Sequence, residues 1–440
     1  RKGGVSVLDG IRAAVSPETE VLYERGCTFL GQALHPFDPS MLRDENGESG
    51  LTGRYYNGPV PQGEPVQVRT DRTVNFNWIF ALPHPALDAN CFSVAWTGSV
   101  VMPRTMDGYI GLSTQDSMRL YVDDKLLIDG WGKEKSADQA LDFHFEAGRT
   151  YKIRIEFVND RRGARVIFGY SAGWENFSAA VEAARKADVA ILCMGDNEET
   201  SGENFDRIDL NLPGRQLELV QAVYATGTPV VLVLQSGRPV TANWENDHLP
   251  AILEAWFPGE QGGTAIAKTL FGNAAPGGRL PITFPRSVGQ IPCHYSRRPG
   301  GGKRYVEMDW LPLYPFGYGL TYTTFAYRDM TLSRSVIGPQ DTVTVSVTVT
   351  NTGKYTGDAV PQLYVRDMFS SVVKPERQLA AFRRLTLAPG ESRRVELTVG
   401  PKQLRTLGPD YVWRVEPGKF ELQLGDNAEN ILLRADLTVE

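Results

Sequence analysis

The 440-residue sequence contains few of the residues that build metal centres and disulfide frameworks. Its four cysteines are spread along the chain without a CxxC pair, which argues against both a zinc site and a disulfide framework. Its five histidines are scattered without the i, i+4 spacing of a helical ligand pair. We therefore expect neither a metal ion nor a cofactor.

Long apolar runs and clusters of positive charge are also missing. No stretch approaches the roughly 18 apolar residues that a membrane-spanning helix requires. No window gathers Lys and Arg as a phosphate-binding surface would, and the formal net charge is −6. A membrane and a nucleic acid are therefore excluded from the expected partners.

The opening residues, "RKGGVSVLDG", lack an initiator Met and any targeting segment. We interpret this start as that of a processed chain or of a piece of a longer protein, and the sequence does not indicate a compartment. With 42% hydrophobic and 22% charged residues the composition is that of a globular protein. At about 100 to 200 residues per domain, the length predicts two to four domains.

Helical and continuous apolar segments alternate in two parts of the chain, residues 1–48 and 173–325. Such alternation predicts right-handed crossovers and a mostly parallel sheet, here in one discontinuous α/β domain. The expected helices are "NFSAAVEAARKA" at 176–187, then 216–224 and 260–270, with a helix end at 9–14. The expected strands are 21–23, 189–194, 229–234, 251–257 and 280–284.

Two other parts of the chain have a period of two, which is typical of half-buried strands. Residues 49–172, in which apolar and polar residues alternate from 151 to 157, predict a β-sandwich that interrupts the α/β domain. Residues 326–440, with "DTVTVSVTVTNTG", predict an immunoglobulin or fibronectin type III-like β-sandwich. The predicted fold class is therefore multidomain α/β plus all-β.

The loop after the strand at 189–194 is rich in carboxylates, and ligands of parallel sheets bind beyond the carboxyl ends of the strands. It reads "GDNEETSGENFDRIDLNLPG", and Arg207 offsets only one of six carboxylates within fourteen residues: Asp196, Glu198, Glu199, Glu203, Asp206 and Asp209. Taken alone, this concentration of carboxylates is typical of a solvated acidic loop, or of a loop in which one carboxyl group acts as a proton donor. A calcium loop is a weaker alternative, because the spacing does not match an EF-hand.

The segment "ENFDRIDLNLPGRQLELV" resembles glycoside hydrolase family 3, in which an "EGYDR" or "EGFDR" loop precedes a Leu, Pro, Gln and Leu pattern. The resemblance continues, in order, through "VVLVLQSGRPV", "AILEAWFPGEQGGTAIAKTLFG", "APGGRLPITFP" and "PLYPFGYGLTYTTF". It implies a retaining, exo-acting β-glucosidase whose α/β domain follows a catalytic barrel.

The resemblance also assigns roles to residues of the acidic loop. The general acid/base glutamate of the family falls on Glu203, and Asn204 stands where the family has Gly. Asp206 and Arg207 match the Asp-Arg pair of the family motif, which we interpret as an internal ion pair that supports the loop.

Residues 49–172 resemble the protective-antigen-like sandwich that some family members insert into this α/β domain, where it restricts substrate length at the active-site mouth. Among its tryptophans, Trp78, Trp96 and Trp131, we expect Trp96 to pack in a core because it lies in an apolar strand. Trp131 follows a strand beside glycines and is the candidate aromatic at the substrate entrance. Calcium-dependent sugar-binding versions of this sandwich carry a pair of adjacent aspartates. Here "TQDS" supplies only Asp116, so a calcium-dependent lectin is not expected.

A retaining glycosidase needs two carboxyl groups about 5 to 5.5 Å apart, and Glu203 supplies one of them. The family nucleophile is an aspartate on an N-terminal (β/α)8 barrel of about 250 residues, which the α/β pattern here is too short to form. We therefore expect this chain to be the C-terminal part of a β-glucosidase, inactive without a barrel on another chain or missing segment.

The expected substrate is a β-glucoside or a short oligosaccharide with a terminal non-reducing β-D-glucosyl residue. A β-xylosidase and an exo-glucanase stay open, because the residues that grip the sugar lie mostly in the barrel. A non-catalytic carbohydrate-binding or adhesion protein is the alternative from another class. A homo-oligomer is also left open.

Overall fold

The structure is a computed structural model, and it describes residues 4–24, 26–27, 34–78, 82–114, 116–132, 138–159, 165–171, 177–197, 200–203, 205–300 and 305–440. The chain divides into two compact units. The larger unit comprises Arg1–Tyr23, Ala183–Pro213 and Val220–Glu440, and the smaller unit comprises Glu24–Glu182 and Gly214–Leu219.

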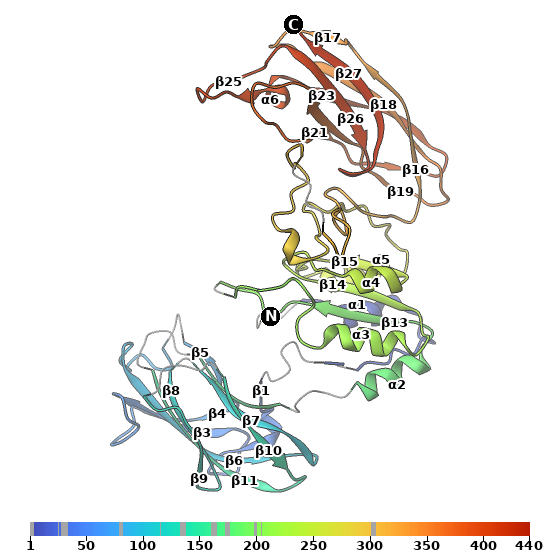
Figure 1. Cartoon of the computed structure of the whole chain (residues 1–440). Coiled ribbons are helices and arrows are strands. Elements are labelled where there is room, and N and C mark those ends of the chain that lie inside the picture. The colour runs from blue at the N-terminus through green and yellow to red at the C-terminus, as the bar shows by residue number, and fades with distance from the viewer. Residues whose placement is uncertain are drawn as a thin grey trace. The chain divides into compact units, whose positions relative to one another are not determined.

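A three-stranded parallel sheet forms the α/β part of the larger unit, drawn in green to yellow in Figure 1. Its order is β13 (Ala190–Gly195), β14 (Val230–Gln235) and β15 (Ala251–Glu254). These strands are continuous apolar runs, as expected of a parallel sheet that is covered on both faces. Helices α1 (Val7–Ala14), α4 (Asn243–His248) and α5 (Gly262–Leu270) belong to the larger unit, whereas the unit boundaries fall within α2 (Ser178–Lys186) and α3 (Gln216–Tyr224). The parallel sheet confirms the α/β prediction.

Two predicted strands are wrong. Residues 21–23 form no strand, and both Leu22 and Tyr23 are exposed rather than covered by neighbours. Residues 280–284 contribute only an isolated bridge between Phe284 and Tyr314, because Pro281 has no N–H to donate to a ladder. The third strand is also shorter than predicted: it ends at Glu254, and Trp256 takes a left-handed φ of 52°.

Helices α1 and α5 pack with their backbones in direct contact. A Cβ on Gly10 would lie 2.2 Å from the Gly263 carbonyl oxygen, and a Cβ on Gly263 would lie 2.0 Å from the Ser6 carbonyl oxygen. Glycine is required at both positions because any side chain would force the two helices apart.

The smaller unit contains two antiparallel sheets. The five-stranded sheet consists of β1 (His35–Pro36), β12 (Arg165–Ser171), β7 (Met106–Thr114), β10 (Asp138–Phe145) and β5 (Asn75–Asn77). The seven-stranded sheet consists of β4 (Gln67–Asp71), β3 (Leu51–Asn57), β6 (Phe92–Val101), β11 (Thr150–Asn159), β8 (Ser117–Val122), β9 (Lys125–Asp129) and β2 (Leu42–Arg43). Trp96 is fully buried in the core between them, as expected.

The C-terminal part of the larger unit, orange to red in Figure 1, is all-β as predicted. A three-stranded sheet holds β16 (Phe325–Leu332), β18 (Val343–Asn351) and β23 (Ser392–Val399). A five-stranded sheet holds β17 (Val336–Ile337), β27 (Ile431–Val439), β26 (Gly418–Gly425), β20 (Gln362–Asp367) and β21 (Gln378–Phe382). The small elements are β19 (Gly357–Ala359), β22 (Leu385–Leu387), α6 (Pro401–Leu404), β24 (Thr406–Leu407) and β25 (Trp413–Arg414). The alternating valines of β18 point into the core.

Within the larger unit, hydrogen bonds join the C-terminal sandwich to the loops that precede it. The buried Gln362 of β20 donates from Nε2 to the Gly317 carbonyl of these loops at 3.0 Å, and within the sandwich to the Asp426 carbonyl at 2.6 Å. Arg297 pairs with Glu376 at 3.2 Å and with Glu429 at 2.8 Å. No helix of the described residues is long and apolar enough to cross a membrane.

Candidate active site

The carboxyl edge of the parallel sheet begins at Gly195, the last residue of β13. Its φ is 137°, and a Cβ there would lie 2.1 Å from the Gln235 carbonyl oxygen of β14. Asp196 then donates its N–H to the same Gln235 oxygen at 2.8 Å. The chain therefore leaves the sheet in a fixed direction, with the Asp196 side chain at the edge where ligands of parallel sheets bind.

The Asp196 carboxylate is buried and hydrogen-bonded on both oxygens, with its side chain 3% exposed. Oδ2 accepts from the Ser236 hydroxyl at 2.7 Å and lies 3.4 Å from Arg238 Nε. Oδ1 accepts from the Thr200 hydroxyl at 3.0 Å and from Arg207 Nη1 at 3.3 Å. A buried charge needs such partners. Here Thr200 and Arg207 lie on either side of Glu203, and Ser236 and Arg238 belong to the loop after β14.

Arg207 fixes the end of that loop that follows Glu203. Besides Asp196, it contacts Asp209 Oδ1 at 3.3 Å and donates to the Asn211 carbonyl at 3.0 Å. In the described residues the ion pairs of Arg207 are thus with Asp196 and Asp209, whereas the sequence predicted a pair with its neighbour Asp206. The expected pairing is corrected: adjacent side chains at 206 and 207 diverge, with Asp206 exposed and Arg207 turned toward the sheet edge.

Glu203 is exposed between these two anchored segments. The preceding turn is closed by hydrogen bonds from the Thr200 and Ser201 N–H groups to the Asn197 carbonyl, at 3.2 and 2.9 Å. An exposed carboxylic acid on a fixed loop can donate a proton to, or accept one from, a ligand at this edge. The predicted Asn204 position, together with Glu198 and Glu199, lies outside the described residues.

Trp131 lies in the smaller unit, just after β9. The backbone N–H of Trp131 donates to Asp129 Oδ1 at 3.3 Å, and the Arg119 guanidinium lies 4.9 Å from the indole ring centroid. One face of the indole is therefore covered by a cation, and the ring is partly exposed. In the part of the chain that the structure describes, no group of three or more His, Cys, Asp or Glu side chains could hold a metal ion.

Sequence reasoning missed a second carboxyl group at the sheet edge, that of the partly buried Glu254 at the end of β15. Oε1 accepts from the Trp256 N–H at 2.9 Å, and in the described residues Oε2 is buried without a hydrogen-bond partner. Burial raises the pKa of Glu254 to about 7. The sequence feature that could have identified Glu254 is the single acidic residue inside the apolar run "AILEAWF".

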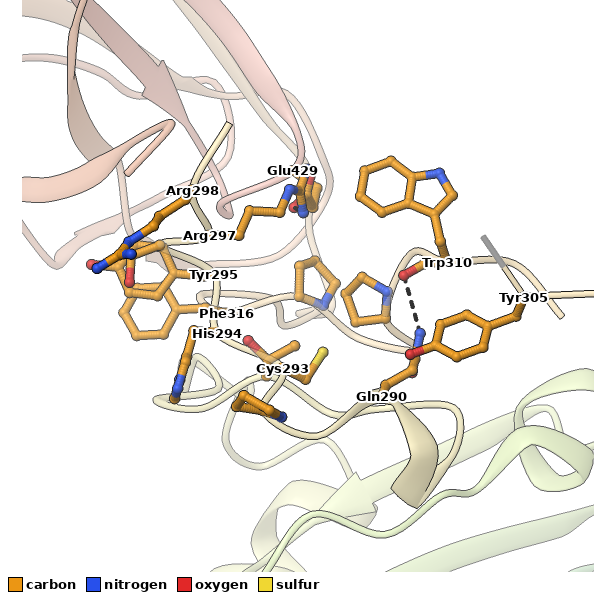
Figure 2. A pocket seen from close by; sticks show the side chains of 15 residues that line it. Gln290, Cys293, His294, Tyr295, Arg297, Arg298, Tyr305, Trp310, Phe316 and Glu429 are labelled. Atoms are coloured by element: carbon orange, nitrogen blue, oxygen red, sulfur yellow. Dashed lines mark hydrogen bonds and ion pairs between the residues drawn. The ribbon is translucent and has the colours of Figure 1, made fainter. Parts of the chain in front are cut away.

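A cavity of about 370 Å³ lies among the loops that lead into the C-terminal sandwich (Figure 2). Tyr295 stacks on Phe316 with ring centroids 4.2 Å apart, and Arg297 lies 4.5 Å from the Trp310 ring. Gln290 Nε2 donates to the Trp310 carbonyl at 3.0 Å, the dashed line in Figure 2. None of the predicted site residues lines this cavity, and these contacts hold the loops to one another.

The sequence pattern of the Glycosyl hydrolase family 3 C-terminal domain matches residues 2–322. The chain belongs to glycoside hydrolase family 3. A fibronectin type III-like domain matches residues 359–428, which confirms the predicted nature of the C-terminal sandwich. The family 3 match includes the loop that carries Glu203.

Known family 3 proteins resemble the chain in sequence and in fold. A β-glucosidase of Rhizobium radiobacter is 34% identical over 99% of this chain and 55% of its own length. A β-xylosidase of Formosa agariphila is 45% identical over 66% of this chain and 42% of its own. A crystal structure of a Kluyveromyces marxianus β-glucosidase superposes with a TM-score of 0.82 at 26% identity, covering 100% of this chain and 56% of that one. The chain thus spans about half the length of the curated relatives it matches.

Proposed function

We propose that this chain supplies the general acid/base residue, Glu203, to a retaining exo-acting β-glucosidase. One observation carries the proposal: within the family 3 segment, Glu203 is exposed at the carboxyl edge of the parallel sheet, on a loop anchored before and after it by Asp196. The substrate is a terminal non-reducing β-D-glucosyl residue, since curated relatives bear β-glucosidase names.

Glu203 acts twice in this reaction. As the aglycone leaves, its carboxylic acid protonates the glycosidic oxygen while a carboxylate nucleophile attacks the anomeric carbon. The resulting Glu203 carboxylate then deprotonates the water that hydrolyses the glycosyl-enzyme and recovers its proton. The sugar keeps its configuration because two inversions occur.

The nucleophile comes from a (β/α)8 barrel in another chain or segment. The parallel sheet of the described residues has three strands, whereas such a barrel has eight. Ile208, five residues after Glu203, is 93% exposed, and Phe205 is also exposed. Two apolar side chains beside the acid are what a covering barrel would bury, and the chain is accordingly proposed to be inactive without it.

Other residues of the proposal have supporting roles. Arg207 holds the loop through Asp196 and Asp209, and Asp206 lies beside it at the surface. The smaller unit is proposed to be a protective-antigen-like insert, with Trp131 as an aromatic at the substrate entrance. The partly exposed indole ring supports this role.

Glu203→Ala tests the assignment in the complete, barrel-containing enzyme. Alkyl glucosides and cellobiose need a proton on the leaving oxygen, so kcat/KM for them should fall about 100- to 10,000-fold. Dinitrophenyl glucoside needs none, and its kcat/KM should stay within a few fold. Asp188→Ala, an exposed carboxylate at the opposite end of the same strand, is the matched control and should change neither value. Equal losses on both substrate classes would contradict the assignment.

The two-part active site has a separate test. A 2-deoxy-2-fluoroglucoside with a good leaving group traps the glycosyl-enzyme on its nucleophile. Mass spectrometry should find the label on the barrel. Label anywhere in this 440-residue chain would disprove the two-part site.

A β-xylosidase is the second candidate, because a β-xylosidase name belongs to the relative that is 45% identical over 66% of this chain. Comparing kcat/KM for aryl β-D-glucoside and aryl β-D-xyloside separates the two, and β-1,3- and β-1,4-glucans test an exo-glucanase. Sugar binding without turnover of any glycoside in the complete enzyme would favour a non-catalytic carbohydrate-binding or adhesion protein.

A further inference from the structure

Asp196 is the point at which three segments of the sheet edge meet. Thr200, before Glu203, and Arg207, after it, both donate to Oδ1. Ser236 and Arg238, from the loop after β14, contact Oδ2. One buried carboxylate therefore joins both flanks of the Glu203 loop to the neighbouring strand.

The loop after β14 reinforces this connection. Arg238 Nη2 lies 3.2 Å from the Ser201 hydroxyl and 3.5 Å from the Thr200 carbonyl. Arg238 thus bridges Asp196 and the residues that immediately precede Gly202 and Glu203. The Asn197 N–H donates to the Thr200 hydroxyl at 3.1 Å, so the same threonine closes the turn.

The electrostatics make Asp196 the critical member. Its carboxylate faces two guanidinium groups, those of Arg207 and Arg238, at 3.3 and 3.4 Å. Arg207 also pairs with the Asp209 carboxylate, but the Asp209 side chain is 42% exposed, whereas the Asp196 side chain is 3% exposed. Loss of the Asp196 charge would leave two cations facing each other in a partly buried site, and both loop flanks would separate from the edge.

We infer that Asp196 is the positioning residue for the proton transfer at Glu203. Asp196 does not touch the substrate. It holds the loop in place and thereby sets the position of the Glu203 carboxyl group relative to the glycosidic oxygen. The inference rests on the proposed function of Glu203, because positioning has meaning only if Glu203 is the acid/base. Proton transfer requires heavy atoms within hydrogen-bond reach, which makes its rate sensitive to a small displacement of the loop.

Asp196→Asn, nearly identical in shape, removes the charge and one acceptor oxygen. In the complete enzyme we expect kcat/KM for alkyl glucosides to fall about 10- to 100-fold, and that for dinitrophenyl glucoside to change less than about threefold. When Asp196→Asn is combined with Glu203→Ala, kcat/KM for alkyl glucosides should fall by less than about twofold below that of Glu203→Ala alone. The reason is that the group that Asp196 positions is already absent.

Asp71→Asn is the matched control. Asp71 is also a buried carboxylate, which accepts from Tyr55 and Trp96 and pairs with Arg69, but it belongs to the smaller unit. It should lower stability without the dependence on leaving group. If Asp196→Asn does not fold, Thr200→Val removes one donor to Asp196 and should give the same selectivity at about three- to tenfold.

Hydrogen exchange provides a readout that does not depend on turnover. In the 440-residue chain, Asp196→Asn should speed exchange of the amides at 200–203 and 205–211 by about tenfold or more and leave β18 and β23 unchanged.

The outcomes separate the two claims. If Glu203→Ala shows no dependence on leaving group, the proposed function fails. If Glu203→Ala shows it while Asp196→Asn and Thr200→Val resemble wild type, only the positioning role of Asp196 is overturned. An additive double substitution would also overturn that role, because Asp196 would then act independently of Glu203.

Discussion

The acidic loop after β13 holds carboxylates in opposite environments. Glu203 is exposed and available to a ligand, whereas Asp196 is buried and its carboxylate contacts four polar side chains. The proposed chemical role and the proposed positioning role thus fall on residues seven positions apart on one loop.

The motif resemblance placed a role on Glu203 but could not single out Asp196 among six carboxylates. The partners of Asp196 on the other side, Ser236 and Arg238, lie about forty residues later, and only the parallel pairing of β13 with β14 brings them close. Charge density along a sequence carries no record of which side chain turns inward. For the same reason Arg207 was matched to its sequence neighbour rather than to Asp196.

Glu254 gives a pH-dependent prediction. In the unfolded chain this carboxyl ionises near its ordinary value of 4.5, but in the folded chain it holds its proton to about 7. The folded state therefore binds more protons between these values, and the contribution of Glu254 to stability is full below pH 4.5 and lost as pH rises to about 7.

Glu254→Gln is neutral at every pH and should remove that decline. We expect the free energy of unfolding, measured in urea, to fall between pH 5 and pH 8 by up to about 3 kcal/mol more for wild type than for the variant. Glu260→Gln, an exposed carboxylate on the following loop, should keep the wild-type decline. Parallel pH profiles for wild type and Glu254→Gln would contradict the burial argument.

Among the elements, apolar periodicity located β13, β14, α3 and α5 within one or two residues, and it located the start of β15 but not its end. It failed where backbone chemistry rather than hydrophobicity decides, as at Pro281, which interrupts an apolar run without a ladder. It was also silent on the α1–α5 packing, because two glycines far apart in sequence give no sign that they meet.

Gly10→Ala tests the packing of α1 against α5, because this packing determines whether the substitution stabilises or destabilises the fold. Inside a helix, alanine is normally about 1 kcal/mol more favourable than glycine. Here the new Cβ would meet the Gly263 carbonyl, so the substitution should instead destabilise by about 1 to 3 kcal/mol. Gly259→Ala, with no atom near the added Cβ, is the control and should stay within about 0.5 kcal/mol. A stabilised Gly10→Ala would show that the helices do not touch at this point.

At the scale of the whole molecule, the larger unit combines an α/β region with the fibronectin type III-like sandwich. Composition and periodicity predicted both parts, but not the contacts between them. These contacts depend on single polar side chains, such as Gln362 and Arg297, that any surface strand or loop could carry.

Gln362→Met should separate the two parts. It removes the hydrogen bond that joins the sandwich to the Gly317 carbonyl, together with one to the Asp426 carbonyl inside the sandwich, and the loss of each partner should cost about 1 to 3 kcal/mol. Calorimetry of the chain should show the unfolding of the sandwich moving away from that of the α/β region. Gln423→Met, a buried glutamine whose amide contacts Glu421 in its own strand, is the control and should move both together. The same unfolding profile for both variants would argue against Gln362 as the link.

The most direct measurement of the central claim is the product that azide forms with Glu203→Ala in the complete enzyme. Without its base, the variant should accumulate glycosyl-enzyme from dinitrophenyl glucoside, and azide, which needs no deprotonation, should attack it from the face that water normally uses. We predict an azide-dependent increase in kcat of about tenfold or more and a β-glucosyl azide identified by NMR. Turnover that azide leaves unchanged, with no glucosyl azide formed, would contradict the assignment of Glu203 as the acid/base.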